Sequence, residues 1–139
     1  MNQPEWQVEN EDLIGELRLT LRKETCPEII DSFEALAHAI WRLATPFLGA
    51  AGTRAVMARS LSLASRDAPL LEKIRVNEEE IDLSEFRAYV ASVGCAAPEV
   101  MDSLLGVEVA MFRTIEDLVG RAVSQHVLRL VREQKQPQT

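Results

Sequence analysis

The segment from Phe33 to Ser65 constrains the fold of this chain more than any other. Its first half continues a set of apolar residues spaced three and four apart, the period that places side chains on one face of an α-helix. These residues are Ile29, Phe33, Leu36, Ala37, Ile40, Leu43, Ala44 and Phe47. Gly49 and Gly52 then indicate a turn, and Thr53 is placed to cap a second helix. The segment therefore predicts a helical hairpin, which is the natural nucleus of a small bundle.

The composition agrees with a helical fold. Leu and Ala dominate an apolar fraction of 47%, whereas aromatic residues make up 5% of the chain. Strong helix formers therefore supply the core, and the alternation of β-branched residues typical of strands is scarce. We predict an all-α, single-domain bundle of about five or six helices spanning residues 1–139. Residues 1–10 are expected to be flexible and residues 132–139 to form a frayed tail.

Capping signals divide the first part of the chain into helices. The apolar stripe between Asp12 and Lys23 indicates a first helix, with acidic residues early and basic residues late. Thr25 and Glu28 have the spacing of a capping box, so a second helix should begin just after Thr25. This helix is expected to run to about Leu48, where the predicted turn begins.

Further signals follow the hairpin. Asp67 is placed to cap a short helix, and the acidic composition of residues 75–83 indicates a surface connection. Asp82 and Glu85 again have capping-box spacing and predict the start of another helix. Gly94 is placed to end it.

The C-terminal stretch from Pro98 to Gln134 keeps a helical period throughout. As one helix it would be about 55 Å long, longer than a compact domain of this size needs. We expect a break or bend at Gly106 or Gly120, and the alternative is one helix that packs partly against another subunit. Residues 116–120 also resemble residues 11–15, which indicates either chance or two related helices around a pseudo-two-fold axis.

The charge of the chain excludes several classes of partner. With 15 basic and 22 acidic residues the net charge is −7, whereas a nucleic-acid binder needs a basic face. The same balance disfavours attachment to an anionic membrane surface. The first residues lack the basic and apolar parts of a secretion signal, and no later run is long enough to span a membrane. We therefore expect a cytoplasmic protein that binds neither nucleic acid nor membrane.

Residues that carry chemistry do not fall into a catalytic or ligand spacing. Cys26 and Cys95 lie far apart and are interpreted as small buried residues, with a disulfide between them left open. His38 follows the polar stripe of its helix, and His126 lies at the edge of an apolar face. Neither histidine belongs to the Glu-x-x-His pair of helical metal sites. We predict no catalytic residue, no cofactor and no metal.

These absences and the abundant apolar periodicity predict a non-enzymatic regulatory or adaptor module. It is expected to act through helix–helix contacts with an unidentified protein partner and to form a homodimer. The predicted dimer interface consists of Phe112, Ile115, Leu118, Ala122 and Val123. The alternative function is a small-molecule sensor with an apolar pocket between helices. That pocket would be lined by Phe33, Trp41, Met57 and Phe112.

Overall fold

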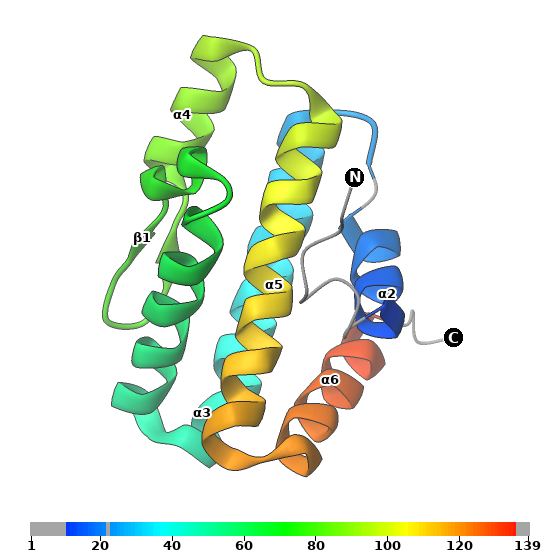
Figure 1. Ribbon diagram of the computed structural model, residues 1–139, viewed down its shortest axis with the longest axis vertical. Coiled ribbons are helices and arrows are strands. Elements are labelled where there is room, and N and C mark those ends of the chain that lie inside the picture. The colour runs from blue at the N-terminus through cyan, green and yellow to red at the C-terminus, as the bar shows by residue number, and fades with distance from the viewer. Residues whose placement is uncertain (1–10, 22, 136–139) are drawn as a thin grey trace.

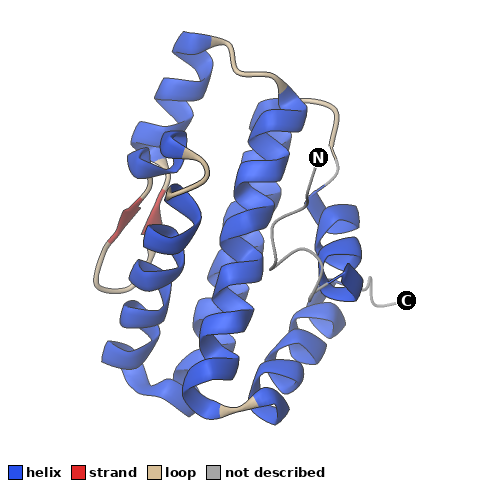
Figure 2. Ribbon diagram, viewed as in Figure 1, coloured by secondary structure: helices blue, strands red, loops and turns tan. Residues whose placement is uncertain are grey.

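Helices make up most of the computed structural model, which describes residues 11–21 and 23–135 (Figure 1, Figure 2). In chain order the elements are α2 (Glu11–Leu21), α3 (Cys26–Ser65), the 3-10 helix η1 (Pro69–Lys73), β1 (Arg75–Val76), β2 (Ile81–Asp82), α4 (Ser84–Val93), α5 (Ala97–Val119) and α6 (Arg121–Lys135). The two strands form a small antiparallel ribbon in which Arg75 lies opposite Asp82. The predicted all-α bundle is confirmed, with this ribbon added at one side.

Helix α3 consists of two arms that run in opposite directions. Thr25 Oγ1 accepts a hydrogen bond from the backbone N–H of Glu28 at 3.3 Å, so the predicted cap starts the first arm, residues 26–48. Gly49 leaves helical geometry with φ 75° and ψ 166°, and the second arm, residues 50–65, returns along the first. In Figure 1 the first arm is cyan and the second arm is green. The predicted helical hairpin is confirmed.

The C-terminal stretch is a second hairpin. Helix α5 ends at Gly120, which has φ 96° and ψ 163°, and α6 then turns back beside α5. Of the two glycines expected to bend this stretch, Gly120 does so, whereas Gly106 lies within α5. The alternative of one continuous helix is therefore wrong. Both hairpin turns lie at the same end of the bundle, the lower end in Figure 1.

Neither of the helix caps predicted at Thr53 and Asp67 forms. Thr53 is completely buried inside the second arm, and its hydroxyl donates a hydrogen bond to the Gly49 carbonyl at 2.8 Å. The arm has already begun at this point, so Thr53 does not cap it. Ala68, rather than Asp67, holds the N-cap position of η1. In both cases the helix begins at a residue different from the one that the side-chain preference indicated.

The connection between η1 and α4 is more ordered than a surface loop. It forms the ribbon, and Ile81 within it is 2% exposed. The predicted cap at Asp82 is wrong, because Leu83 holds the N-cap position of α4. Asp82 Oδ1 instead accepts hydrogen bonds from the N–H and the hydroxyl of Ser84, at 2.9 and 2.7 Å. The capping-box partner expected for Asp82, Glu85, instead pairs with Arg75 at 3.2 Å. At the other end of α4, Gly94 has φ 73° and ψ 44° and ends the helix as predicted.

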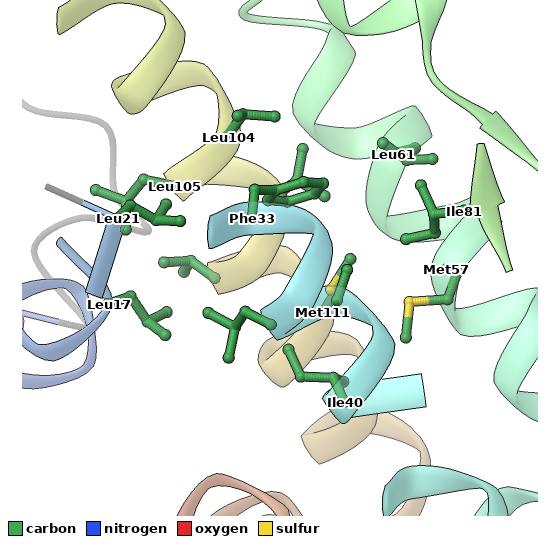
Figure 3. Close-up of a cluster of buried hydrophobic side chains, with 14 of the residues drawn as sticks. Leu17, Leu21, Phe33, Ile40, Met57, Leu61, Ile81, Leu104, Leu105 and Met111 are labelled. Atoms are coloured by element: carbon green, nitrogen blue, oxygen red, sulfur yellow. The ribbon is translucent and has the colours of Figure 1, made fainter. Parts of the chain in front are cut away.

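The core lies between the two arms of α3 and α5, and the shorter elements cover it. Figure 3 shows Phe33 of the first arm near Leu104 of α5, whereas Leu105 lies beside Leu21 of α2 and Met57 lies on the side of the ribbon. Burial of one such side chain contributes about 1.5–3 kcal/mol. Among the described residues, Glu108 on α5 is the only ionisable side chain in the buried class.

The fold reveals a repeat in the sequence that links the two hairpins. The first arm of α3 and its turn align without a gap to α5 and its turn, at a separation of 71 residues. The identical pairs are Pro27 and Pro98, Glu28 and Glu99, Asp31 and Asp102, Ser32 and Ser103, Ala39 and Ala110, Arg42 and Arg113, Gly49 and Gly120, Ala51 and Ala122, and Val56 and Val127. A short helix precedes each hairpin, α2 in one half and α4 in the other. Residues 11–65 and 84–135 therefore have the same three-helix arrangement.

An ion pair joins each short helix to the opposite half. Arg18 on α2 pairs with Asp102 on α5 at 3.2 Å, and Arg87 on α4 pairs with Asp31 on α3 at 2.8 Å. The two aspartates are an identical pair of the repeat, whereas the arginines occupy different positions: 71 residues after Arg18 stands Tyr89. Each short helix therefore contacts the hairpin of the other half, as a pseudo-two-fold arrangement would place it. The similarity of residues 11–15 and 116–120 does not mark such an axis. The first segment begins α2 and the second ends α5, so they are not equivalent elements.

Candidate functional site

The thiols and histidines lie in separate parts of the bundle. Cys26 and Cys95 are both reduced, and Cys26 Sγ donates a hydrogen bond to the Cys95 carbonyl at 3.3 Å. His38 is exposed on α3. His126 on α6 has Nδ1 2.6 Å from Arg129 Nη2, and its ring meets Phe47 edge-on with centroids 5.7 Å apart.

Neither a metal-binding cluster nor a membrane-spanning helix occurs within residues 11–21 and 23–135. No group of three or more His, Cys, Asp or Glu side chains there is arranged to hold a metal ion. In the same part of the chain, every helix is too short or too polar to cross a membrane.

The predicted dimer interface is divided between the core and the surface. Phe112 and Ile115 are 2% and 0% exposed, because α6 turns back at Gly120 and helps to cover the apolar face of α5. These two residues belong to the core of the chain, so their assignment to an interface is wrong. Val123 is partly buried against the same core, whereas Leu118 is 60% exposed and Ala122 is exposed.

The predicted apolar pocket does not form around its four residues. Phe33 and Met57 are completely buried in the packed core, where facing helices fill the space between them. Trp41 and Phe112 line two different hollows at the surface. The prediction is wrong because residues with the same helical period lie at different depths and on different sides of the bundle.

Among the described residues four large apolar side chains are exposed: two lie at the hairpin turns, and the other two are Leu19 on α2 and Val93 on α4. Phe47 and Leu118 are 44% and 60% exposed and occupy equivalent positions of the repeat, two residues before Gly49 and Gly120. Ala51 and Ala122, also equivalent, are exposed just after these glycines. We call Phe47, Ala51, Leu118 and Ala122 the turn-end surface.

A polar cleft of about 950 Å3 lies between α2, α5 and α6. Its lining includes both basic and acidic side chains, and we call it the arginine cleft: Arg113, Arg121, Arg129 and Arg132 with Asp12, Glu16 and Glu116. The pairs within it join neighbouring helices or turns: Arg132 Nε donates to Glu16 Oε2 at 2.9 Å, and Arg121 lies 3.4 Å from Glu116. Phe112, Leu13 and Leu128 add apolar surface.

Two smaller hollows flank the second half of α3 and the ribbon. One, of about 580 Å3, lies between the second arm of α3 and α5 and includes Arg59 and Arg113. The other, of about 470 Å3, lies where Glu79 and Glu80 at the tip of the ribbon meet Trp41 and Arg42 of the first arm. This second hollow marks where the ribbon rests on α3.

One carboxyl group has a clearly shifted acidity. The hydroxyl of Ser84, then its N–H, donate hydrogen bonds that lower the pKa of Asp82, and the charge of Arg75 acts in the same direction. These contacts favour the charged form of Asp82. Asp82 and Ser84 lie at the start of α4, and neither residue lines the arginine cleft.

Sequence reasoning missed both surfaces as units. The arginines of the cleft come from α5 and α6, and only the turn at Gly120 brings them together. Phe47 follows the apolar period of the first arm, so the sequence placed it on the core face. The arm ends only one residue later, before Gly49, and Phe47 is 44% exposed. The signal that identifies the turn-end surface in the sequence is the gapless repeat, which pairs Phe47 with Leu118.

Comparison with known proteins adds no relative. No family model, no curated protein and no solved structure matches the chain.

Proposed function

We propose that this chain is a non-enzymatic adaptor or regulatory module that binds other proteins through its helices and forms a homodimer. The observation that carries the proposal is the exposure of Leu118 and Phe47, at 60% and 44%, at the hairpin-turn end of the bundle. Large apolar side chains gathered on a surface are typical of protein–protein contact. The sensor with an apolar pocket is not retained, because Phe33 and Met57 are enclosed in the core.

The turn-end surface suits contact with a second copy. An isologous dimer needs a patch that is complementary to itself. Leu118 is flanked by Asp117 and Arg121, which are both exposed and opposite in charge. Across a two-fold axis, each charge of one copy faces the opposite charge of the other. This arrangement supports a homodimer centred on Leu118.

The test is the mass of the chain in solution, measured by light scattering after size-exclusion chromatography. The wild type is expected at about 31 kDa, twice the 15.5 kDa of one chain. Leu118→Glu should give a folded monomer, because dimerisation would bury an unpaired charge. Phe47→Glu should act in the same direction.

The matched control is Val93→Glu on α4, because Val93 is 57% exposed and lies outside the turn-end surface. It should leave the mass unchanged. A wild type that remains at 15.5 kDa at every concentration up to about 100 μM would remove the homodimer from the proposal.

A further inference from the structure

The two cysteines of the chain lie next to each other in space, although residues 27–94 separate them in the sequence. Cys26 Sγ donates a hydrogen bond to the carbonyl oxygen of Cys95 at 3.3 Å. A carbonyl oxygen lies about 2.4 Å from the Cα of its own residue, so the Cys26 sulfur is no more than about 5.7 Å from the Cys95 Cα. The two side chains are therefore close enough for a disulfide to form after a small movement.

Both cysteines lie where a long helix begins, at the end of the bundle opposite the hairpin turns (Figure 1). Cys26 is the first residue of α3, and Cys95 lies in the short connection between α4 and α5. Both are half-buried against the core, whereas the adjacent residues Thr25, Gly94 and Ala96 are exposed. The pair is therefore held in place by packing and is still within reach of a small molecule in solution.

The repeat shows that packing alone does not require sulfur at this place. The positions equivalent to Cys26 and Cys95, at the separation of 71 residues, are Ala97 and Glu24. Ala97 is half-buried against the core in the same way as Cys26, so an alanine fills the equivalent position at the start of α5. The thiol pair is a feature that one of two equivalent places possesses and the other lacks.

We propose that Cys26 and Cys95 form a thiol pair that reacts reversibly with a small disulfide such as oxidised glutathione, giving an intramolecular disulfide. The thiolate of one cysteine attacks a sulfur of the oxidant, the sulfur–sulfur bond of the oxidant breaks, and one glutathione thiolate leaves. The thiolate of the other cysteine then attacks the protein sulfur of this mixed disulfide and expels the second glutathione. The two cysteines are oxidised, the oxidant is reduced to two thiols, and these thiols take up the two protons.

The disulfide joins the start of α3 in the first half to the connection before α5 in the second half. It closes a loop of about 70 residues, which restricts the unfolded chain more than the folded one. The oxidised chain is therefore more stable than the reduced chain. Because the pair and the turn-end surface lie at opposite ends of the bundle, this inference does not depend on the proposed homodimer.

The experiment equilibrates the full-length chain with mixtures of reduced and oxidised glutathione, stops the exchange with acid and measures the intact mass. As the oxidised fraction of glutathione rises, the wild type should lose two hydrogen atoms and keep the mass of one chain. An excess of reduced glutathione should restore both hydrogen atoms. The midpoint of thermal unfolding, Tm, should be about 5–15 °C higher for the oxidised chain than for the reduced chain.

Single variants test the role of each cysteine. Cys26→Ser and Cys95→Ser each keep one thiol, so the reaction should stop at the mixed disulfide, with the added mass of one glutathione. The matched control combines Cys95→Ser with Ala96→Cys, which keeps two thiols at nearly the same separation but moves one to the exposed neighbouring position. At the same glutathione ratio it should form at least about tenfold less intramolecular disulfide. Circular dichroism shows that each variant remains helical.

The proposal is overturned if the wild type stops at the mixed disulfide or forms disulfides only between two chains. It is equally overturned if the control with Ala96→Cys oxidises as readily as the wild type, because bond formation would then not depend on the folded geometry. A lower Tm after oxidation would also overturn it, since the bond would then distort the folded chain. Light scattering should give the same mass before and after oxidation, so failure of the homodimer and failure of the thiol pair are separate results.

Discussion

The two halves of the bundle share one backbone arrangement and differ in what lies over their hairpins. The first half has Ala50, Ala58 and Leu61 on its second arm, where the second half has Arg121, Arg129 and Arg132 on α6. Leu61 is 7% exposed and packs in the core, and residues 69–82 pack over this half. The comparison teaches that one repeat unit can be covered by a connecting segment in the first half and line a cleft with charged side chains in the second.

The largest losses of stability should come from equivalent positions in the core of the two halves. Phe33 and Leu104 are equivalent and completely buried. Phe33→Ala should lower the free energy of unfolding by about 3–5 kcal/mol and Leu104→Ala by about 2–5 kcal/mol, because each leaves a cavity. Urea melts measure both.

The control for these core substitutions is His38→Ala. His38 is exposed on the same arm as Phe33, so His38→Ala should change the free energy of unfolding by no more than about 0.5 kcal/mol. A loss at His38 as large as that at Phe33 would contradict the orientation of the first arm.

Replacing the glycine of either hairpin turn by alanine should lower the free energy of unfolding by a similar amount. Gly49 and Gly120 both combine a positive φ with ψ near 165°, at 166° and 163°, a region that is essentially restricted to glycine. Gly49→Ala and Gly120→Ala should each cost about 1–3 kcal/mol of backbone strain, since no atom outside the turn lies within 4 Å of the added methyl group.

Gly15→Ala on α2 is the matched control for the turns. Its added methyl group also meets open space, but Gly15 is helical, so alanine should stabilise the chain by about 0.5–1 kcal/mol. Thermal or urea melts would contradict the equivalence of the turns if Gly49→Ala were harmless and Gly120→Ala were not.

The exchanged ion pairs should have small and similar effects. Arg18–Asp102 and Arg87–Asp31 are both largely exposed, so double-mutant cycles with alanine should give coupling free energies below about 1 kcal/mol. Arg87→Ala alone should cost more stability than Arg18→Ala, because Arg87 also lies 3.3 Å from Glu34. A coupling above about 2 kcal/mol in either cycle would contradict this account.

The smallest effect concerns Asp82, which lies in the segment that only the first half possesses. Its pKa is lowered in the folded chain, chiefly by the Ser84 hydroxyl. The stabilisation is therefore fully present above the unfolded pKa of about 3.9 and is lost as the pH falls through the lower folded value.

Carbon-detected NMR of the Asp82 carboxyl measures this titration directly. Ser84→Ala should raise its pKa toward the ordinary value, because the hydroxyl donor is removed. A midpoint that does not change in Ser84→Ala would show that the hydroxyl is not the main cause.

Local signals predicted the parts of the fold that depend on neighbouring residues. Thr25 caps α3, Gly94 ends α4 and Gly120 ends α5, because a cap or a positive φ involves only one turn of chain. Thr53 and Asp67 had equally suitable side chains and do not act as caps. Their helices start where packing places them, and packing is decided by residues far away in the sequence.

The candidate surfaces could be predicted only in part. The helical period identified Leu118 and Ala122 together with Phe112 and Ile115, but it did not separate exposed from buried members of the set. That separation depends on α6, which turns back and covers part of α5. Periodicity gives the face of a helix, whereas exposure requires knowing which element covers that face.

By itself, the sequence predicted the helical class and the hairpin of α3, because these follow from spacing along the chain, and it left open whether the C-terminal stretch is one helix or two. Only the tertiary structure decided how the halves meet. It exchanges α2 and α4 between them, places residues 69–82 over one half and brings Arg113 and Arg132 together in a cleft of the other. The physical reason is that helix–helix packing joins residues far apart in sequence, and spacing along one helix does not specify which surfaces remain uncovered.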